Sequence, residues 1–161
     1  ETMYVLWGLG IAAAVLLLDQ ASKYWILNDV LAEKSFIIYT SFFNLVKAWN
    51  TGVSFSMFND WGWVGILVLS LLALTIVGFL FNWLRHEKNR YMQAALGMII
   101  GGALGNVIDR VRLGAVFDFL DFHIGVHHWP AFNVADSFIC IGAVMIIVYS
   151  IAVKTEKEEK K

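Results

Sequence analysis

Charged residues are scarce in this chain: Asp, Glu, Lys and Arg make up 16% of its 161 residues, and apolar residues make up 59%. Soluble domains usually carry about 25% charged residues, so the composition excludes an ordinary soluble domain and indicates a membrane protein. The formal net charge is -1. No basic patch of the size needed for nucleic-acid binding is present, and we expect no nucleic-acid partner.

Cysteine is almost absent. The one cysteine, Cys140, lies inside an apolar run. It cannot form an intramolecular disulfide, so it carries no information about the redox compartment. Because a free cysteine packs like a small hydrophobic residue, we expect the Cys140 thiol to be buried and inert.

The motifs of several enzyme classes are also missing. The sequence contains no H-E-x-x-H, no P-loop and no serine nucleophile elbow. His123, His127 and His128 could form a metal site with Asp118 or Asp121, but no second cluster of ligands accompanies them. We interpret the histidines as interfacial residues and expect neither a metal nor another cofactor.

Four apolar runs are long enough to cross a membrane, which takes about 17 to 25 residues. Each must be helical, because hydrocarbon offers no water to the backbone N–H and C=O groups. The first run is too long for a signal-peptide core and lacks an A-x-A pattern near its end, so we interpret it as a retained helix. The prediction is an all-α membrane protein with four transmembrane helices in one domain, residues 1–161. The expected spans are 3–27, 61–84, 91–112 and 134–153.

Lys and Arg are unevenly distributed between the connections. They gather in the loop 85–90 and in the tail 154–161, whereas the connection 113–133 has none and the connection 28–60 has two. Positive residues mark the cytoplasmic side of a membrane protein. We therefore expect both termini in the cytoplasm and the two poorly charged connections outside.

The outer connection 28–60 contains short runs with β-strand patterns, at 35–39, 43–49 and 53–57. Asn50-Thr51-Gly52 is typical of a turn between the last two. We expect a small extracytoplasmic β platform on the membrane surface. The alternative is an irregular interfacial loop.

No charged residue falls in the inner half of a predicted span. Asp19, Lys23, Asp109, Arg110 and Asp136 lie in the outer halves, together with Asn106, and Asn133 lies at the outer start of the fourth span. Each intramembrane charge costs about 2.5 to 3.5 kcal/mol on insertion scales and so needs a reason. A scatter of structural salt bridges would not select one depth, and we predict a single site near the outer face.

Two carboxylates at this face, Asp118 and Asp136, have no cation next to them in the sequence. Two carboxylates close together in apolar surroundings share one proton. Such a pair suits peptide hydrolysis, in which one acid deprotonates a water and the other protonates the scissile carbonyl. The structural alternatives are an N-cap for Asp136 and a turn residue, in the loop after the third span, for Asp118. On chemistry alone, Asp121 competes with Asp118.

The remaining charged residues have structural interpretations. Asp109 and Arg110 are expected to neutralise each other. Asp19 and Lys23 are four residues apart and can pair on one helix face, or they can orient a backbone segment of a substrate.

Asparagines and glycines accompany these charges. Asn50, Asn106 and Asn133 can hold a peptide or fix an aspartate. On the third span, glycines at positions 97, 101 and 105 share a face and allow another helix to approach closely. Gly101 and Gly102 could also line the site.

Five segments resemble the motifs of the bacterial lipoprotein signal peptidases, or type II signal peptidases. They occur in the family's order and extend from the first span to the start of the fourth. They are DQASK at 19–23, NTGVSFS at 50–56, GGALGNVIDR at 101–110, VFDF at 116–119 and FNVADS at 132–137. One modest departure is Val53-Ser54, where small alanines are common in the family.

The resemblance implies an intramembrane aspartyl endopeptidase of the bacterial inner membrane. Such enzymes remove the signal peptide from a prolipoprotein, cleaving before a cysteine that carries diacylglycerol, and are inhibited by globomycin. The motif match implies that Asp118 and Asp136 are the catalytic pair, and so resolves Asp118 against Asp121. It also implies supporting positions, which are Asp19, Lys23, Asn50, Gly102, Asn106, Arg110 and Asn133.

Two rival classes of function are considered. A small transporter with a carboxylate proton relay needs polar groups at several depths, and the predicted inner halves carry no charge. A purely structural membrane subunit has no need of either aspartate.

Overall fold

The four apolar runs form four long helices in the computed structural model, which describes residues 2–52 and 62–159. Each helix is long and apolar enough to cross a membrane, which confirms the prediction of four such helices. The first helix continues beyond its predicted end as a short π-helical segment, η1. The elements are α1 (Thr2–Trp25), η1 (Ile26–Val30), α2 (Gly62–His86), α3 (Arg90–Leu113) and α4 (Val134–Glu159).

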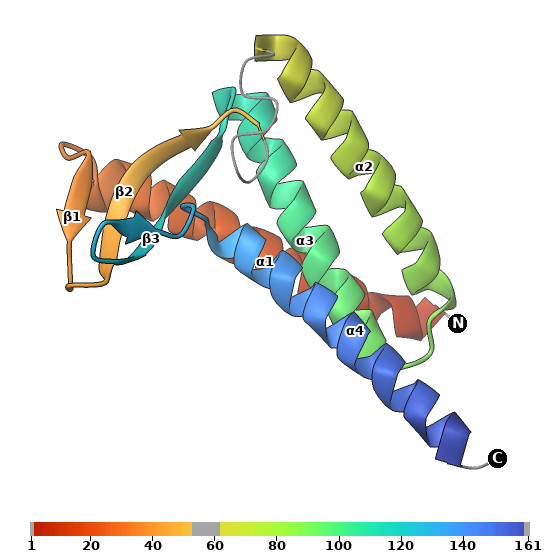
Figure 1. Ribbon diagram of the computed structural model, residues 1–161. Coiled ribbons are helices and arrows are strands. Elements are labelled where there is room, and N and C mark those ends of the chain that lie inside the picture. Colours follow the sequence, from red (N-terminus) through yellow and green to blue (C-terminus); the bar gives the residue numbers. More distant parts are fainter. Residues whose placement is uncertain (1, 53–61, 160–161) are drawn as a thin grey trace.

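α3 is the central helix and packs against α1, α2 and α4 (Figure 1). Its glycine face meets α1: a Cβ added at Gly97 would overlap the carbonyl oxygen of Gly8, and one at Gly101 would overlap that of Ala12. The prediction of a close helix contact is therefore confirmed. The idea that Gly101 lines the site is wrong, because α1 covers it.

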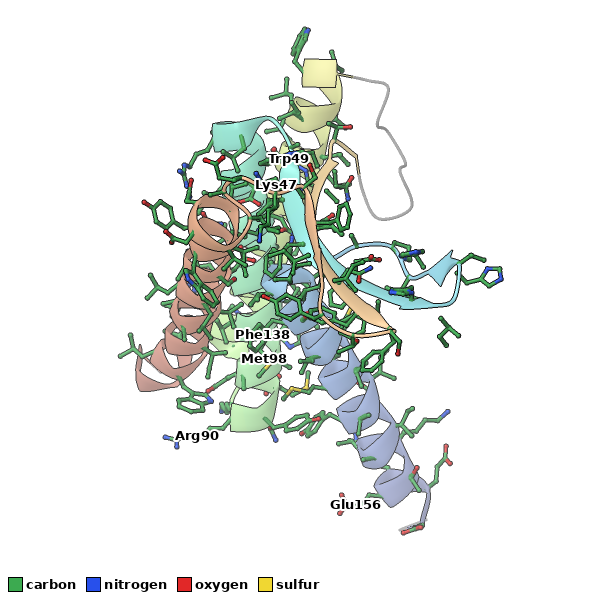
Figure 2. All side chains as sticks on the ribbon, turned by 90° about the vertical axis from the view of Figure 1, so that its left-hand side faces the viewer. Lys47, Trp49, Arg90, Met98, Phe138 and Glu156 are labelled. Carbon is green, nitrogen blue, oxygen red and sulfur yellow. The ribbon has the colours of Figure 1, made fainter. Side chains whose placement is uncertain are left out.

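The outer surfaces of the helices are apolar, as a lipid environment requires. Leu17 of α1 is 70% exposed, Phe79 of α2 is 74% exposed and Ile151 of α4 is 61% exposed. Charged side chains such as Arg90 and Glu156 lie at the helix ends remote from the sheet (Figure 2). Both termini and the α2–α3 connection also lie at that end (Figure 1).

A four-stranded antiparallel sheet lies at the other end, in the order β1-β2-β3-β4. The strands are β1 (Phe36–Ile38), β2 (Phe43–Asn50), β3 (Val116–Ile124) and β4 (His127–His128). The platform is confirmed, with β1 and β2 at two of the predicted runs. The third run, 53–57, lies outside the described residues.

β3 is the main difference from the sequence prediction, which placed Asp118 in a loop. This strand pairs with β2, and its first residues are buried on both faces. A strand buried on both faces shows no clean alternation of polar and apolar residues, so periodicity alone does not reveal it. α3 ends at Leu113, and its C-cap Gly114, with a φ of 75°, turns the chain into β3.

Phe117 and Phe119 pack in one apolar cluster with Ile26 and Leu31, next to η1. Because side chains alternate along a strand, Asp118 points to the opposite face. A register shift in the β2–β3 pair, between Leu45 and Ala48, lies beside this point. Bulges of this kind re-aim neighbouring side chains.

An isolated bridge joins Leu120 of β3 to Phe132, the residue just before Asn133. The Phe132 carbonyl oxygen accepts hydrogen bonds from the N–H groups of Phe119 and Leu120, at 3.1 and 2.9 Å. The bridge therefore holds the start of α4 beside the strand that carries Asp118.

Candidate active site

Asn133 precedes α4 and caps its N-terminus. Its Oδ1 accepts the Asp136 N–H at 2.9 Å, and Asp136 Oδ2 in turn accepts the Asn133 N–H at 3.2 Å. This reciprocal pair is a capping box. The alternative in which Asp136 is itself the N-cap is therefore wrong, because Asn133 occupies that position.

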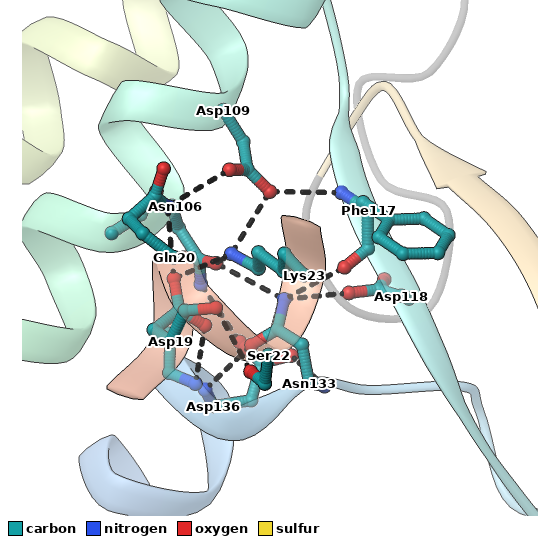
Figure 3. A network of polar contacts seen from close by, with 12 residues as sticks. Asp19, Gln20, Ser22, Lys23, Asn106, Asp109, Phe117, Asp118, Asn133 and Asp136 are labelled. Atoms are coloured by element: carbon teal, nitrogen blue, oxygen red, sulfur yellow. Dashed lines mark hydrogen bonds and ion pairs between the residues drawn. The ribbon is translucent and has the colours of Figure 1, made fainter. Parts of the chain in front are cut away.

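Asn133 also holds the second aspartate. Its Nδ2 donates to Asp118 Oδ1 at 2.9 Å, and Asp118 is only 3% exposed (Figure 3). One fully buried side chain thus touches Asp118 and caps the turn that carries Asp136. The structure brings together two acids that lie far apart in the sequence.

Asn106 of α3 contacts the other side of Asp136. Its Nδ2 donates to Asp136 Oδ1 at 2.9 Å, while its Oδ1 accepts from Lys23 Nζ and from Asn133 Nδ2, both at 3.1 Å. An ammonium group can only donate hydrogen bonds. Lys23 therefore orients the Asn106 amide so that its NH2 group points to Asp136.

Lys23 is buried between two carboxylates. Its Nζ lies 2.8 Å from Asp19 Oδ2, which confirms the predicted pair one helical turn apart, and 2.9 Å from Asp109 Oδ2. The expected pair of Asp109 with Arg110 is wrong, because successive residues of a helix point in different directions. Arg110 instead donates from Nη2 to the Gly52 carbonyl oxygen at 3.0 Å.

Asn50 lies at the end of β2, and its side chain is hydrogen-bonded to Asp118. Its Oδ1 also accepts the Gly52 N–H at 3.0 Å, which forms the start of the predicted turn. Gly102 lies on the face of α3 that meets α4, where an added Cβ would come within 2.6 Å of the Ala135 carbonyl oxygen. Gly102 therefore permits close approach of the turn that holds Asp136.

The pKa of Asp118 is raised to about 7, chiefly because burial disfavours its charged form and secondly because Asp136 lies nearby. Hydrogen bonds from Asn50 and Asn133 and the charge of Lys23 act in the opposite direction. At neutral pH, Asp118 can therefore carry a proton while it faces a second carboxyl group.

A cavity of about 300 Å³ opens beside Asp136, between α2, α3, α4 and the sheet. Its wall includes Asp136, Asn106, Asn50 and Arg110. The buried Arg110 Nε has no hydrogen-bond partner among the described residues. The cavity wall thus combines the carboxyl group of Asp136 with the guanidinium-bearing side chain of Arg110.

A second cavity, of about 380 Å³, extends along the start of α4 and shares Asp136 and Cys140 with the first. Cys140 is exposed, so the expectation of a buried thiol is wrong. It follows Asp136 by four residues and lies on the same helix face. An apolar sequence context could not distinguish a helix face turned to the core from one that lines a cavity.

Family membership follows from a comparison with known proteins. Residues 11–152 match the model of the family described as signal peptidase (SPase) II. The chain belongs to the signal peptidase II family. Membership implies that the protein is a peptidase, and together with the four apolar helices it indicates a multi-pass membrane protein.

Curated relatives agree with the signal peptidase II assignment. The lipoprotein signal peptidase of Janthinobacterium sp. (strain Marseille) is 47% identical over 142 residues, which cover 86% of this chain and 84% of the relative. The lipoprotein signal peptidase of Rhodopseudomonas palustris (strain TIE-1) is 44% identical over 151 residues, which cover 89% and 92%.

Solved structures of bacterial membrane enzymes share the fold of this signal peptidase II chain. One superimposes with a TM-score of 0.77 at 32% identity, covering 96% of this chain and 91% of the other. A second has a TM-score of 0.71 at 31% identity, covering 88% and 90%.

Asp121 lies in the platform and has partners of its own. It accepts hydrogen bonds from Asn44 Nδ2 at 3.0 Å and pairs with His128 Nδ1 at 2.7 Å. Asp118 and Asp121 are an odd number of residues apart on β3, so they point to opposite faces. Within residues 2–52 and 62–159, no three His, Cys, Asp or Glu side chains are grouped as a metal site would require.

Sequence reasoning missed Gln20 and misjudged Asp109. Gln20 Nε2 donates to Asp109 Oδ1 and to Asp19 Oδ2, both at 3.1 Å, and Asp109 is only 2% exposed. The available signal was a polar residue in the outer half of a span, next to Asp19. It indicates burial with partners but does not identify the partners.

Proposed function

We propose that the protein is an intramembrane aspartyl endopeptidase with Asp118 and Asp136 as its catalytic pair. Its substrates are prolipoproteins, and it cleaves before a cysteine that carries diacylglycerol. The observation that carries the proposal is the position of Asn133, which hydrogen-bonds to Asp118 and to the turn of Asp136 at the wall of a cavity. Membership of the signal peptidase II family supports the same class of substrate.

In the proposed mechanism, the two carboxyl groups hold one proton between them. The ionised group removes a proton from a water molecule, whose oxygen attacks the scissile carbonyl carbon. The protonated group donates its proton to the carbonyl oxygen, and the resulting tetrahedral intermediate collapses as the C–N bond breaks. The amine of the lipidated cysteine leaves with a proton, and the pair returns to its singly protonated state.

The supporting residues divide into two groups by their contacts. Asn133 and Asn106 hold the catalytic pair, whereas Arg110 lines the cavity, where its guanidinium group can donate to a substrate carbonyl oxygen. Asn50 contacts Asp118 and lines the cavity, so it can serve both purposes. Gly102 leaves room for α4 to approach.

The proposed placement in the membrane follows the distribution of charge. We place the chain in the bacterial inner membrane as a single domain, with both termini in the cytoplasm and the site near the outer face. There the lipid chains of a substrate can stay in the bilayer, and a globomycin-like inhibitor can enter the same cavity. The fully or nearly fully buried charged side chains of the described residues lie toward the sheet, and they are Asp19, Lys23, Asp109, Asp118 and Asp121.

Activity is expected to fall as the pH rises above about 7. The pair needs one proton, and the pKa of Asp118 is about 7, so the singly protonated state is lost on the alkaline side. The measurement is kcat/KM against pH with a diacylglyceryl-modified prolipoprotein in detergent. The apparent pKa belongs to the coupled pair, and an activity that still increases at pH 9 contradicts the shared proton.

Alkylation of Cys140 is expected to reduce cleavage by about tenfold or more, which corresponds to ~1.4 kcal/mol or more. The thiol is exposed and lines the cavity with Asp136, so a maleimide group there obstructs the substrate. Labelling is specific because the sequence holds one cysteine. The control is the Cys140→Ala protein, which should keep after treatment the rate that it had before. Full labelling of the unmodified chain without loss of rate contradicts the placement of the substrate.

A further inference from the structure

Two carboxylates outside the catalytic pair make the same kind of contact. Asp19 Oδ1 accepts the N–H of Ala135 at 2.9 Å, and Ala135 directly precedes Asp136. Asp109 Oδ2 accepts the N–H of Phe117 at 3.0 Å, and Phe117 directly precedes Asp118. Each carboxylate therefore holds the backbone immediately next to one catalytic aspartate.

A single cation joins these two carboxylates. Lys23 Nζ lies 2.8 Å from Asp19 Oδ2 and 2.9 Å from Asp109 Oδ2 (Figure 3). Gln20 spans the same gap, because its Nε2 donates to both side chains. Asp19 and Asp109 are therefore joined through one ammonium group and one amide.

Lys23 has no hydrogen left for a substrate. An ammonium group has three donors, and Lys23 Nζ has three acceptors, which belong to Asp19, Asp109 and Asn106. Its side chain is about 5% exposed. Because all three donors of Lys23 have acceptors within the protein, we interpret Lys23 as a structural link between α1 and α3 and not as a residue that orients the substrate backbone.

The connection is anchored in rigid elements. Asp19 and Lys23 belong to α1 and Asp109 to α3. The two helices approach closely at Gly105, where an added Cβ would overlap the Asp19 carboxylate. Because helix backbones are stiff, α1 and α3 hold Asp19 and Asp109 at a fixed separation. The hydrogen bonds of these two carboxylates to Ala135 and Phe117 then fix the positions of the segments that carry the catalytic pair.

We propose that Lys23, together with Gln20, Asp19 and Asp109, sets the separation of Asp118 and Asp136, so that Lys23 and Asp109 are positioning residues. The inference rests on the proposed function, since it assigns a role relative to that catalytic pair. A misplacement of about 1 Å can reduce a rate by about 100-fold. The side chains that determine the spacing can therefore affect the rate without touching the substrate.

The test is the Lys23→Met variant, which removes the ammonium group and keeps a long side chain. We expect kcat to fall about 100-fold with little change in KM. The alkaline limb of the pH profile should move to higher pH, because the charge of Lys23 lowers the pKa of Asp118. Lys34→Met is the matched control, because Lys34 is exposed on the loop before β1.

A second variant addresses folding. Lys23→Met leaves two buried carboxylates without their cation, whereas Lys23→Met combined with Asp109→Asn keeps the net charge of the group unchanged. The double variant should remain folded by thermal unfolding and should still show the loss in kcat. Asp29→Asn, at an exposed aspartate of η1, controls for the removal of an acid.

Three results overturn the inference: a normal kcat in the folded Lys23→Met protein, a rise in KM at unchanged kcat, or a loss of kcat with no shift of the pH limb. Failure of the proposed function is a separate result, namely cleavage that survives Asp136→Asn. The titration of Asp118 can be measured without substrate from the infrared band of its carboxyl group. The band is assigned by its absence from the spectrum of the Asp118→Asn variant. The titration followed by that band should still move to higher pH in Lys23→Met, because the charge of Lys23 lowers the pKa of Asp118.

Discussion

The Asp136→Asn variant is expected to lose prolipoprotein cleavage by on the order of 10⁴-fold. Asparagine has the shape of aspartate but can neither accept a proton from water nor share one with Asp118. Asn106 Nδ2 can still donate to the remaining oxygen of residue 136, because that contact needs only an acceptor. The loss should therefore be in catalysis, with the chain still inserted and folded.

The measurement is the mobility shift of a diacylglyceryl-modified prolipoprotein on a gel, with Asp118→Asn tested alongside. Asp121→Asn is the matched control, since Asp121 lies on the same strand and is bound by Asn44 and His128. It should retain activity. Normal processing by Asp136→Asn refutes the proposed pair, and inactivity of Asp121→Asn alone would transfer the role to Asp121.

The Gly97→Val variant is expected to destabilise the protein by about 1 to 3 kcal/mol, and to lower its melting temperature by roughly 2 to 12 °C. A Cβ at Gly97 would overlap the carbonyl oxygen of Gly8 and lie 3.1 Å from the Cβ of Ile11. These are backbone and branch-point atoms, which cannot rotate away. Relief requires α1 to move from α3, and this displaces Asp19 and Lys23 from the site.

The measurement is thermal unfolding in detergent, followed by cleavage assays on the folded fraction. Gly78→Val on α2 is the matched control, because among the described residues a Cβ at that position meets no atom of another element within 4 Å. Both variants introduce the same β-branched residue into a helix interior, so their intrinsic helix penalties are alike. Equal melting temperatures for the two variants contradict the close packing of α1 on α3.

Local rules explain what could be predicted. The spans follow from the requirement that backbone groups in hydrocarbon satisfy one another within a helix. The Asp19–Lys23 pair and the glycine face follow from helical spacing, which places residues four apart side by side. All of these predictions depend on neighbours within one or two helical turns, and the structure confirms them.

The errors involve contacts between distant segments. The sequence predicts a loop at β3, because the pairing of β3 with β2 and its burial come from other parts of the chain. It predicts the wrong partner for Asp109, because a cation adjacent in sequence is not adjacent on a helix. It predicts a buried Cys140, because an apolar sequence does not show which side of a helix borders a cavity.

By itself, the sequence determined the four helices and which segments of them carry the charged residues, because hydrophobicity and helical period act over short distances. Only the tertiary structure decided which of those groups meet. Lys23 is hydrogen-bonded to Asn106, which lies 83 residues away in the sequence, and Asp19 to Ala135, which lies 116 residues away. Contacts of that range depend on helix packing and on the bridge between β3 and the start of α4, and no local pattern encodes them.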